Sequence, residues 1–320
     1  MLTFLIRRTI GAVLVCIAVT FIVFLIFIVV PGGGKLGTAE RIAGKNATPQ
    51  NVINIEHDWG FDKPFYIQYE RMIRKMFTNQ LVSYTSGQKV LTQIWEGLPA
   101  TFSLTVGAGI IWLFFGILVG VISGVTAGRL SDRVITVLAL IGISMPVFWL
   151  GIISRYYLAE GGITTFFPDG EYVGLTQNPL GWLSHLILPW LVLAVLFIGF
   201  YGRVLRGNIL DTINEDFVRT AKAKGLTPRR ILFRHVLRTS LIPIVTLFGL
   251  DFASVLGGGA ILTETVFDLH GVGQYAEQSI NNFDLPPIMG VTMYGAFFIV
   301  VFSMLVDLFY AYLDPRIRPT

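Results

Sequence analysis

One acidic residue lies inside a long apolar stretch, where ionisable side chains are rare and usually functional. Asp251 stands about ten residues into that stretch, at a depth where an ionised carboxylate costs several kcal/mol unless it faces water or a partner. Two interpretations stay open: Asp251 lines a pathway through the membrane, or it forms an interhelical hydrogen bond or ion pair that fixes packing. Helices could pack closely around Asp251, because small residues lie nearby at Gly249, Gly257, Gly258 and Gly259.

A serine, a proline and two aromatic residues fall together in another apolar block. Pro146 is expected to kink a helix and to leave Phe148 and Trp149 beside a cavity, with Ser144 in the same candidate pathway set. Ser144 paired with His185 would suit an intramembrane hydrolase, but no nucleophile-elbow motif surrounds that serine. We therefore expect no catalytic residue in this group.

Motifs for cofactors and metals are missing from the sequence. No Gly-x-x-x-x-Gly-Lys-[Ser/Thr] run is present to cradle nucleotide phosphates. Glu56-His57-Asp58 looks metal-like but lacks convergent ligands, and Cys16 is the single cysteine, so a thiolate cluster cannot form within the chain. The sequence predicts neither a cofactor nor a metal here.

An ordered basic segment separates two apolar blocks over 202–240. Its centre is the run of residues that we single out as a candidate docking site, Arg219, Thr220, Ala221, Lys222, Ala223, Lys224, Gly225 and Leu226. Gly225 can take a positive φ angle at a helix end, and Pro228 can begin a second helix that is expected to reach about Thr239. The pattern predicts a helix, a turn and a helix.

The first of these two helices has one face on which Phe217, Ala221 and Lys224 recur. A short helix held by a tight turn and tied at both ends to rigid elements can transmit force. The alternative interpretation, a basic loop that binds anionic membrane lipid, depends on charge alone.

The elements that must position these residues are membrane helices. Of the 320 residues, 53% are hydrophobic and only 14% are charged, against about 25% in soluble proteins. The net charge of +4 comes from basic residues that flank apolar blocks rather than from one soluble patch, which excludes nucleic acid as a partner. No segment alternates strictly as a strand does, so an all-α polytopic membrane protein is expected.

Six segments are long and apolar enough to cross a bilayer, at 8–30, 99–127, 134–158, 184–201, 241–262 and 288–312. The corresponding domain boundaries are 1–30 for the first span with its N-terminus, 31–98 for an extracytoplasmic subdomain, 99–312 for a five-span core and 313–320 for the tail. Within the subdomain, 65–77 is expected to be helical. Near the inner end of the last span, Asp307 is assigned a structural role.

The orientation follows from the basic residues. The short loops 159–183 and 263–287 contain neither Lys nor Arg, whereas 202–240 is rich in both. Short cytoplasmic loops carry the excess of Lys and Arg, so both termini are expected to be cytoplasmic. Arg155, near the outer end of the third span, is expected to snorkel to the interface.

Several short motifs, in order along the whole chain, resemble the permease subunits of ATP-binding-cassette importers of the dipeptide, oligopeptide and nickel family. The matching segments are Gly60-Phe61-Asp62-Lys63-Pro64, Leu98-Pro99-Ala100-Thr101, Ser144-Met145-Pro146-Val147-Phe148-Trp149-Leu150-Gly151, Leu262-Thr263-Glu264-Thr265-Val266-Phe267 and Leu313-Asp314-Pro315-Arg316-Ile317-Arg318. Two departures stand out. Arg219-Thr220-Ala221 replaces the general Glu-Ala-Ala of the coupling motif, and Pro31-Gly32-Gly33-Gly34 replaces a Pro-Gly-Asp-Pro run.

The resemblance implies a type I importer fold, similar to the methionine permease, with six transmembrane helices. It also implies partners: a second homologous permease, two ATPase subunits that hold ATP and magnesium, and an extracytoplasmic substrate-binding protein. The chain would be a transport subunit in a bacterial or archaeal plasma membrane rather than an enzyme. Peptides, nickel chelates, glutathione and some oligosaccharides all stay open as substrates, and a proton-coupled transporter using Asp251 is the competing class.

Overall fold

The computed structural model describes residues 2–29, 34–44 and 47–313, with side chains over 6–29, 37–44 and 47–306. Most of these residues are helical, and the part of the chain described contains only two isolated β-bridges and no strand. The glycines at 32 and 33, the tail 314–320 and the Asp307 side chain lie outside the described residues. The all-α fold class is confirmed.

Five helical segments are long and apolar enough to cross a membrane: Ile6–Val29, Val90–Val125, Pro179–Thr212, Ile242–Gly259 and Leu285–Val306. A sixth span is a pair of helices, α6 (Leu130–Ser144) and α7 (Val147–Leu158), bent by 98°. The expected six spans are therefore present if this bent pair counts as one.

The third span, expected over 134–158 with a kink at Pro146, is broken into two helices there. Met145 and Pro146 have extended backbone angles between α6 and α7. Proline lacks the N–H that a helix interior needs and pushes the preceding residue out of the helical region, so the chain breaks rather than kinks.

The fourth span is much longer than the expected 184–201. Helix α8 runs over Pro179–Thr212 with Pro189 inside it, and α5 likewise begins at Val90 rather than Pro99. Apolar windows mark only the part of a helix that lies in lipid, whereas polar residues at its ends continue the same backbone hydrogen bonding.

The fifth span is also interrupted. Helix α12 (Ile242–Ser254) continues through a π-helical turn, η4 (Val255–Gly259), and the short α13 (Ile261–Val266) follows. Gly258 has φ of 126°, which is not helical and which only glycine adopts without strain. The continuous helix expected over 241–262 therefore ends near this glycine.

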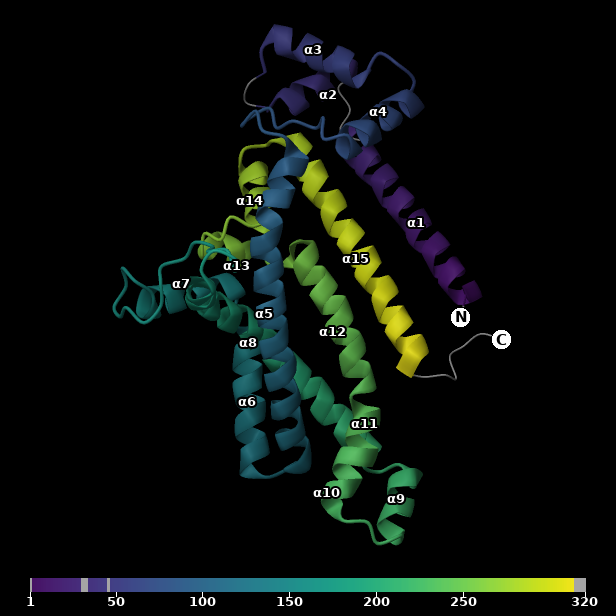
Figure 1. Cartoon of the computed structure of the whole chain (residues 1–320), viewed down its shortest axis with the longest axis vertical. Coiled ribbons are helices and arrows are strands. Elements are labelled where there is room, and N and C mark those ends of the chain that lie inside the picture. Colours follow the sequence, from purple (N-terminus) through teal and green to yellow (C-terminus); the bar gives the residue numbers. More distant parts are fainter. Residues whose placement is uncertain (1, 30–33, 45–46, 314–320) are drawn as a thin grey trace. The chain divides into compact units, whose positions relative to one another are not determined.

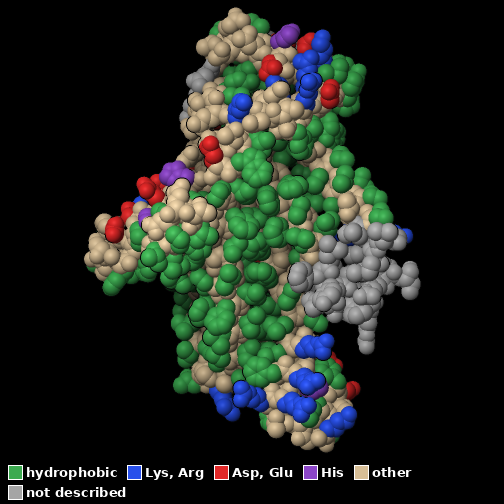
Figure 2. Space-filling model, in the orientation of Figure 1, with side chains coloured by type: hydrophobic (Ala, Val, Ile, Leu, Met, Phe, Trp, Pro, Cys, Tyr) green, Lys and Arg blue, Asp and Glu red, His purple; other side chains and the backbone are tan. Residues whose placement is uncertain are grey.

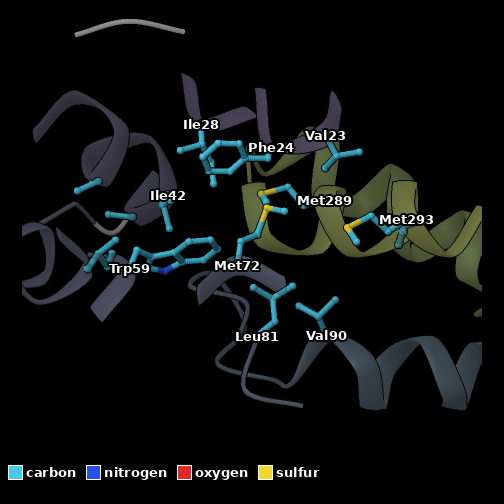
Figure 3. Close-up of a cluster of buried hydrophobic side chains, with 14 of the residues drawn as sticks. Val23, Phe24, Ile28, Ile42, Trp59, Met72, Leu81, Val90, Met289 and Met293 are labelled. Carbon is cyan, nitrogen blue, oxygen red and sulfur yellow. The ribbon is translucent and has the colours of Figure 1, made fainter. Parts of the chain in front are cut away.

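The chain divides into two compact units, of which one combines residues 1–102 with 253–320. It contains α1 (Leu2–Phe24), α2 (Gly34–Ala43), α3 (Pro49–Trp59) and α4 (Phe65–Phe77), together with α14 (Val272–Asn281) and α15 (Leu285–Leu313). The helix expected over 65–77 is confirmed as α4. Figure 3 shows part of the core of this unit, where Trp59 and Met72 lie among side chains from α1, α2 and α15.

The other unit is 103–252 and holds the basic hairpin. Helix α9 (Asp216–Ala223) is followed by α10 (Pro228–Ile231), a π-helical turn η3 (Leu232–Val236) and α11 (Leu237–Ser240), which leads into α12. Figure 1 shows α9 beside α10, and Figure 2 shows Lys and Arg side chains gathered over these two helices.

Candidate functional site

The basic hairpin has the predicted helix–turn–helix form. Gly225 has φ of +74°, its N–H donates to Lys222 O at 2.9 Å, and the N–H of Leu226 donates to Ala221 O at 3.3 Å. These two bonds are the Schellman arrangement that closes a helix on a left-handed residue. Pro228 then stands at the first position of α10, as expected.

Helix α9 packs through a narrow face. Val218 and Ala221 are buried, whereas Phe217 is 43% exposed and Lys224 is also exposed. Of the eight predicted coupling residues, Ala221 alone is buried and Leu226 is half-buried, so the other six present their surfaces to solvent. Ala221 is therefore the one member of the predicted Phe217, Ala221 and Lys224 face that packs, and Val218 packs beside it.

Both ends of the hairpin are joined by hydrogen bonds that sequence analysis missed. Ser240 on α11 donates through Oγ to Asn208 O at 3.2 Å and lies 3.1 Å from Thr212 Oγ1 on α8. Asn208 Nδ2 in turn donates to Ser240 O at 3.3 Å. The helices at the entry and the exit of the hairpin, α8 and α11, are therefore held together. Polar residues at the border of an apolar block were the available signal.

An ion pair joins α8 to the turn between α5 and α6 in the same unit. Arg206 on α8 donates to both carboxylate oxygens of Asp132, at 2.7 and 2.8 Å, and Asp132 also accepts from Ser123 Oγ at 2.5 Å and from the N–H of Gly128 at 2.8 Å. The Asp132 side chain is 5% exposed. This bidentate pair joins the end of α5, the following turn, α6 and α8, and sequence analysis did not identify it.

Asp251 on α12 accepts a hydrogen bond from the Tyr201 hydroxyl on α8 at 2.7 Å. Tyr201 is fully buried, and a Cβ added at Gly116 would lie 2.7 Å from Tyr201 Cβ, so that glycine lets α5 and α8 approach closely. Asp251 itself is half-buried. An interhelical hydrogen bond is thus present, while the pathway interpretation stays a prediction.

The other candidate pathway residues meet at the 98° bend. Ser144, Pro146, Phe148 and Trp149 line an open hollow of about 630 Å³ together with Val137, Leu140, Ile141 and Met145. Phe148 and Trp149 are 43% and 45% exposed, as a residue beside a cavity would be. Asp251 is not part of this lining, so the five candidates divide into two places.

The hydrolase alternative lacks the required contact. Ser144 Oγ donates to Leu140 O of its own helix at 2.8 Å, and the His185 Nδ1 lies 2.5 Å from Gly170 O. A nucleophile and its base must hydrogen-bond to each other, and here each is engaged elsewhere.

The Arg155 side chain, which was expected to reach the interface, has an acidic partner. It forms two contacts with Asp169, at 2.5 and 3.0 Å, in the loop beyond α7. The Arg155 guanidinium holds the pKa of the Asp169 carboxyl below its usual range. The pair is partly exposed on both sides and therefore contributes little to stability.

In the unit formed by 1–102 and 253–320, Glu264 is a buried carboxylate. Its Oε2 accepts from the N–H of Gln274 at 3.0 Å, while the N–H of Val272 donates to Thr101 Oγ1 at 2.9 Å. Burial raises the pKa of Glu264 to about 7. A Cβ at Gly271 would lie 2.3 Å from Glu264 Oε2, so a larger residue there would displace the carboxylate. The sequence motif around Glu264 was recognised, but this role was not.

Comparison with known proteins agrees with this architecture. The family model described as the binding-protein-dependent transport system inner membrane component matches residues 116–319, and its N-terminal companion matches 1–105. The probable peptide ABC transporter permease protein y4tP of Sinorhizobium fredii is 35% identical over 98% of this chain and 99% of its own length. The probable D,D-dipeptide transport system permease protein DdpB of Escherichia coli is 36% identical over 97% and 96%.

A solved structure extends the likeness to the fold. The inward-facing MetNI methionine ABC transporter matches with a TM-score of 0.52 and 16% identity, over 70% of this chain and 97% of that one. The likeness in fold agrees with a type I importer permease, as expected. This chain belongs to the family of binding-protein-dependent transport system inner membrane components, the multi-pass permease subunits of ATP-binding-cassette importers.

Proposed function

We propose that this chain forms half of a translocation pathway for di- or oligopeptides and works by alternating access. The relatives that support the substrate class are named as peptide, dipeptide and D,D-dipeptide permeases, and they match nearly end to end. A second, homologous permease would supply the other half, and an extracytoplasmic binding protein would deliver the peptide.

The observation that carries the coupling role is the hairpin of α9 and α10. Its exposed residues stand on a turn fixed by Gly225, and its ends are joined through Ser240, Asn208 and Thr212. Force applied at Arg219–Leu226 would therefore reach α8 and α12 rather than be lost in a flexible loop. ATP and magnesium would be held by two separate ATPase subunits, which would dock at this surface.

Orientation and domain roles complete the proposal. Lys and Arg gather on 202–240 and are lacking in 159–183 and 263–287, which supports cytoplasmic termini and a cytoplasmic hairpin. The segment 31–98 would then be the extracytoplasmic subdomain, between the first span in 1–30 and the core 99–312.

Coupling is tested by adding bulk at two exposed alanines. Ala223→Trp alters the outer surface of α9, and Ala127→Trp alters the turn between α5 and α6, where Ala127 is equally open to solvent. We expect Ala223→Trp to reduce both peptide uptake and substrate-stimulated ATP hydrolysis in proteoliposomes at least about tenfold, and Ala127→Trp to leave both within about twofold. Equal behaviour of the two variants would contradict the coupling role.

The substrate class is tested separately. Uptake of a labelled dipeptide is compared between the complete transporter and one without this chain, with nickel chelate, glutathione and an oligosaccharide as competitors. Competition by unlabelled peptides alone is the expected result, whereas competition by another class would identify that class instead.

A further inference from the structure

Helix α4 has one side packed against the rest of its unit. Met72 is fully buried, and Tyr69, Ile73 and Met76 pack against the same core at spacings of three and four residues. This side faces α1, because the Tyr69 hydroxyl and Thr20 Oγ1 lie 2.6 Å apart and the Tyr69 ring contacts Phe21 and Phe24.

A second side of α4 is tied to α3. Arg71 donates to the carbonyl of His57 at 2.9 Å, and Lys75 pairs with Asp58 at 2.6 Å and lies 5.8 Å from the Trp59 ring centre. Helix α3 is rich in polar residues, and its exposed end carries the segment from Glu56 to Asp58. The α3 side of α4 is therefore its polar side.

The third side of α4 carries exposed aromatic residues. Tyr66 is 61% and Phe77 is 77% exposed. With about 100° between successive residues, these two lie about 20° apart around the helix and about 150° from the mean direction of Arg71 and Lys75. Two large aromatic side chains thus point away from the polar helix, whereas Phe65, which is 62% exposed, lies about 100° from Tyr66 around the start of α4.

The depth of α4 follows from its contact with α1. Thr20 lies nine residues before Val29, the end of the 24-residue apolar span. At about 1.5 Å per residue, Thr20 lies about 14 Å from the Val29 end of the span. The whole 24-residue span is about 36 Å long, so a hydrocarbon core of about 30 Å leaves only about 6 Å of it outside. Thr20 therefore stays about 8 Å or more inside the hydrocarbon edge, and Tyr69, which contacts it, reaches down from a helix near that edge.

We propose that α4 lies in the lipid–water interface at the Val29 end of α1, with Tyr66 and Phe77 inserted between the headgroups and the upper acyl chains. Aromatic residues are favoured at this level, and an amphipathic helix with one apolar flank lies flat there. Glu70 lies about 40° around the helix from Tyr66 and about 20° from Phe77, and Arg74 lies about 80° from Tyr66, so these two exposed charged residues border the aromatic side at the level of the headgroups. The lipid surface would thereby hold the helices of 34–77 at a fixed height. This inference depends only on α1 spanning the membrane.

Spin-label depth measurements test the proposal. In the assembled transporter in phosphatidylcholine nanodiscs, with Cys16→Ser and other accessible cysteines removed, labels are placed by Tyr66→Cys and Phe77→Cys. Ile53→Cys is the matched control, because Ile53 is an apolar side chain on α3 that is 53% exposed. We expect the ratio of oxygen to nickel-chelate accessibility to be at least about threefold higher at 66 and 77 than at 53.

Two results would overturn the proposal. One is a water-like ratio at 66 and 77 that equals the ratio at 53 while peptide uptake shows each variant to be folded. The other is nickel-chelate access at 66 and 77 that disappears only when the binding protein is added, since that face would then dock a protein rather than lipid.

Discussion

Glu264 on α13 and Gln274 on α14 are joined by a 3.0 Å hydrogen bond from the Gln274 N–H to a carboxylate with no exposed surface. The other oxygen, Oε1, is buried and has no hydrogen-bond partner. A backbone N–H near the start of a helix stabilises negative charge, but burial disfavours it more strongly, so the protonated form is favoured in the folded state.

The first prediction is a pH dependence of this junction. Burial raises the pKa of Glu264 from 4.5 to about 7. Between these values the folded chain holds a proton that the unfolded chain has released, so the stability that Glu264 contributes is fully present below about pH 4.5 and is lost as pH rises through about 7. The loss is limited to about 3 kcal/mol, at 1.36 kcal/mol per tenfold change in proton affinity.

Amide hydrogen exchange checks this prediction. After correction for intrinsic rates, protection over 272–281 should fall between pH 5 and pH 8 in the wild-type chain and should change much less in Glu264→Gln, which cannot ionise. His270 and Asp268 are present in both chains, so the difference isolates Glu264. Equal pH dependence in the two chains would assign the effect to another group.

The second prediction concerns the glycine that faces Glu264. In Gly271→Ala the new Cβ would lie 2.3 Å from Glu264 Oε2 and 2.7 Å from Thr101 Oγ1, so the junction must open, at a cost of about 1–3 kcal/mol. Gly207→Ala is the control, because nothing lies within 4 Å of its Cβ and alanine favours a helix interior. Thermal unfolding should separate the two, and an unchanged melting temperature for Gly271→Ala would contradict the geometry.

Predictions are confirmed where one local pattern determines one local structure. Tyr66, Tyr69, Met72, Ile73 and Met76 recur near one face and predict a helix over 65–77, which is α4, although Tyr66 is 61% exposed and does not join the packed side. Gly225 followed by Pro228 predicts the turn. Such patterns depend on residues three to ten positions apart, which the sequence displays directly.

Contacts between distant residues could not be read in this way. Thr101 and Val272 are 171 positions apart, and Asp132 and Arg206 are 74 apart, so their pairing depends on how whole helices cross. The break at Pro146 was expected only as a kink, because sequence does not reveal whether neighbouring groups will satisfy the backbone freed by a proline.

The third prediction compares two ion pairs of similar geometry and different burial. Asp132→Ala removes the carboxylate that accepts both short contacts from Arg206, in a site where the Asp132 side chain is 5% exposed. We expect the free energy of unfolding to fall by about 3 kcal/mol. Asp169→Ala removes the partner of Arg155 where both side chains are more than a third exposed, and the loss should stay below about 1 kcal/mol.

Denaturation of the two variants in the same detergent gives the comparison. In addition, Arg206→Met combined with Asp132→Ala should recover part of the loss, because no uncompensated charge then remains. Equal losses for Asp132→Ala and Asp169→Ala would show that burial does not distinguish the pairs.

The last prediction separates the two interpretations of Asp251. Tyr201→Phe removes the 2.7 Å hydrogen bond but keeps the carboxylate, whereas Asp251→Asn keeps a hydrogen-bond acceptor for Tyr201 and removes the charge. If Asp251 meets the transported peptide, Asp251→Asn should lower uptake by about tenfold, equivalent to about 1.4 kcal/mol, and Tyr201→Phe should lower it much less. If the hydrogen bond serves packing, Tyr201→Phe should lower the melting temperature and Asp251→Asn should leave uptake intact.

Of these two results we expect the loss of uptake in Asp251→Asn, because an ionisable residue within a span is retained at a cost that packing alone rarely offsets. Uptake is measured at matched amounts of assembled transporter, so that a failure to assemble is not mistaken for a failure to transport.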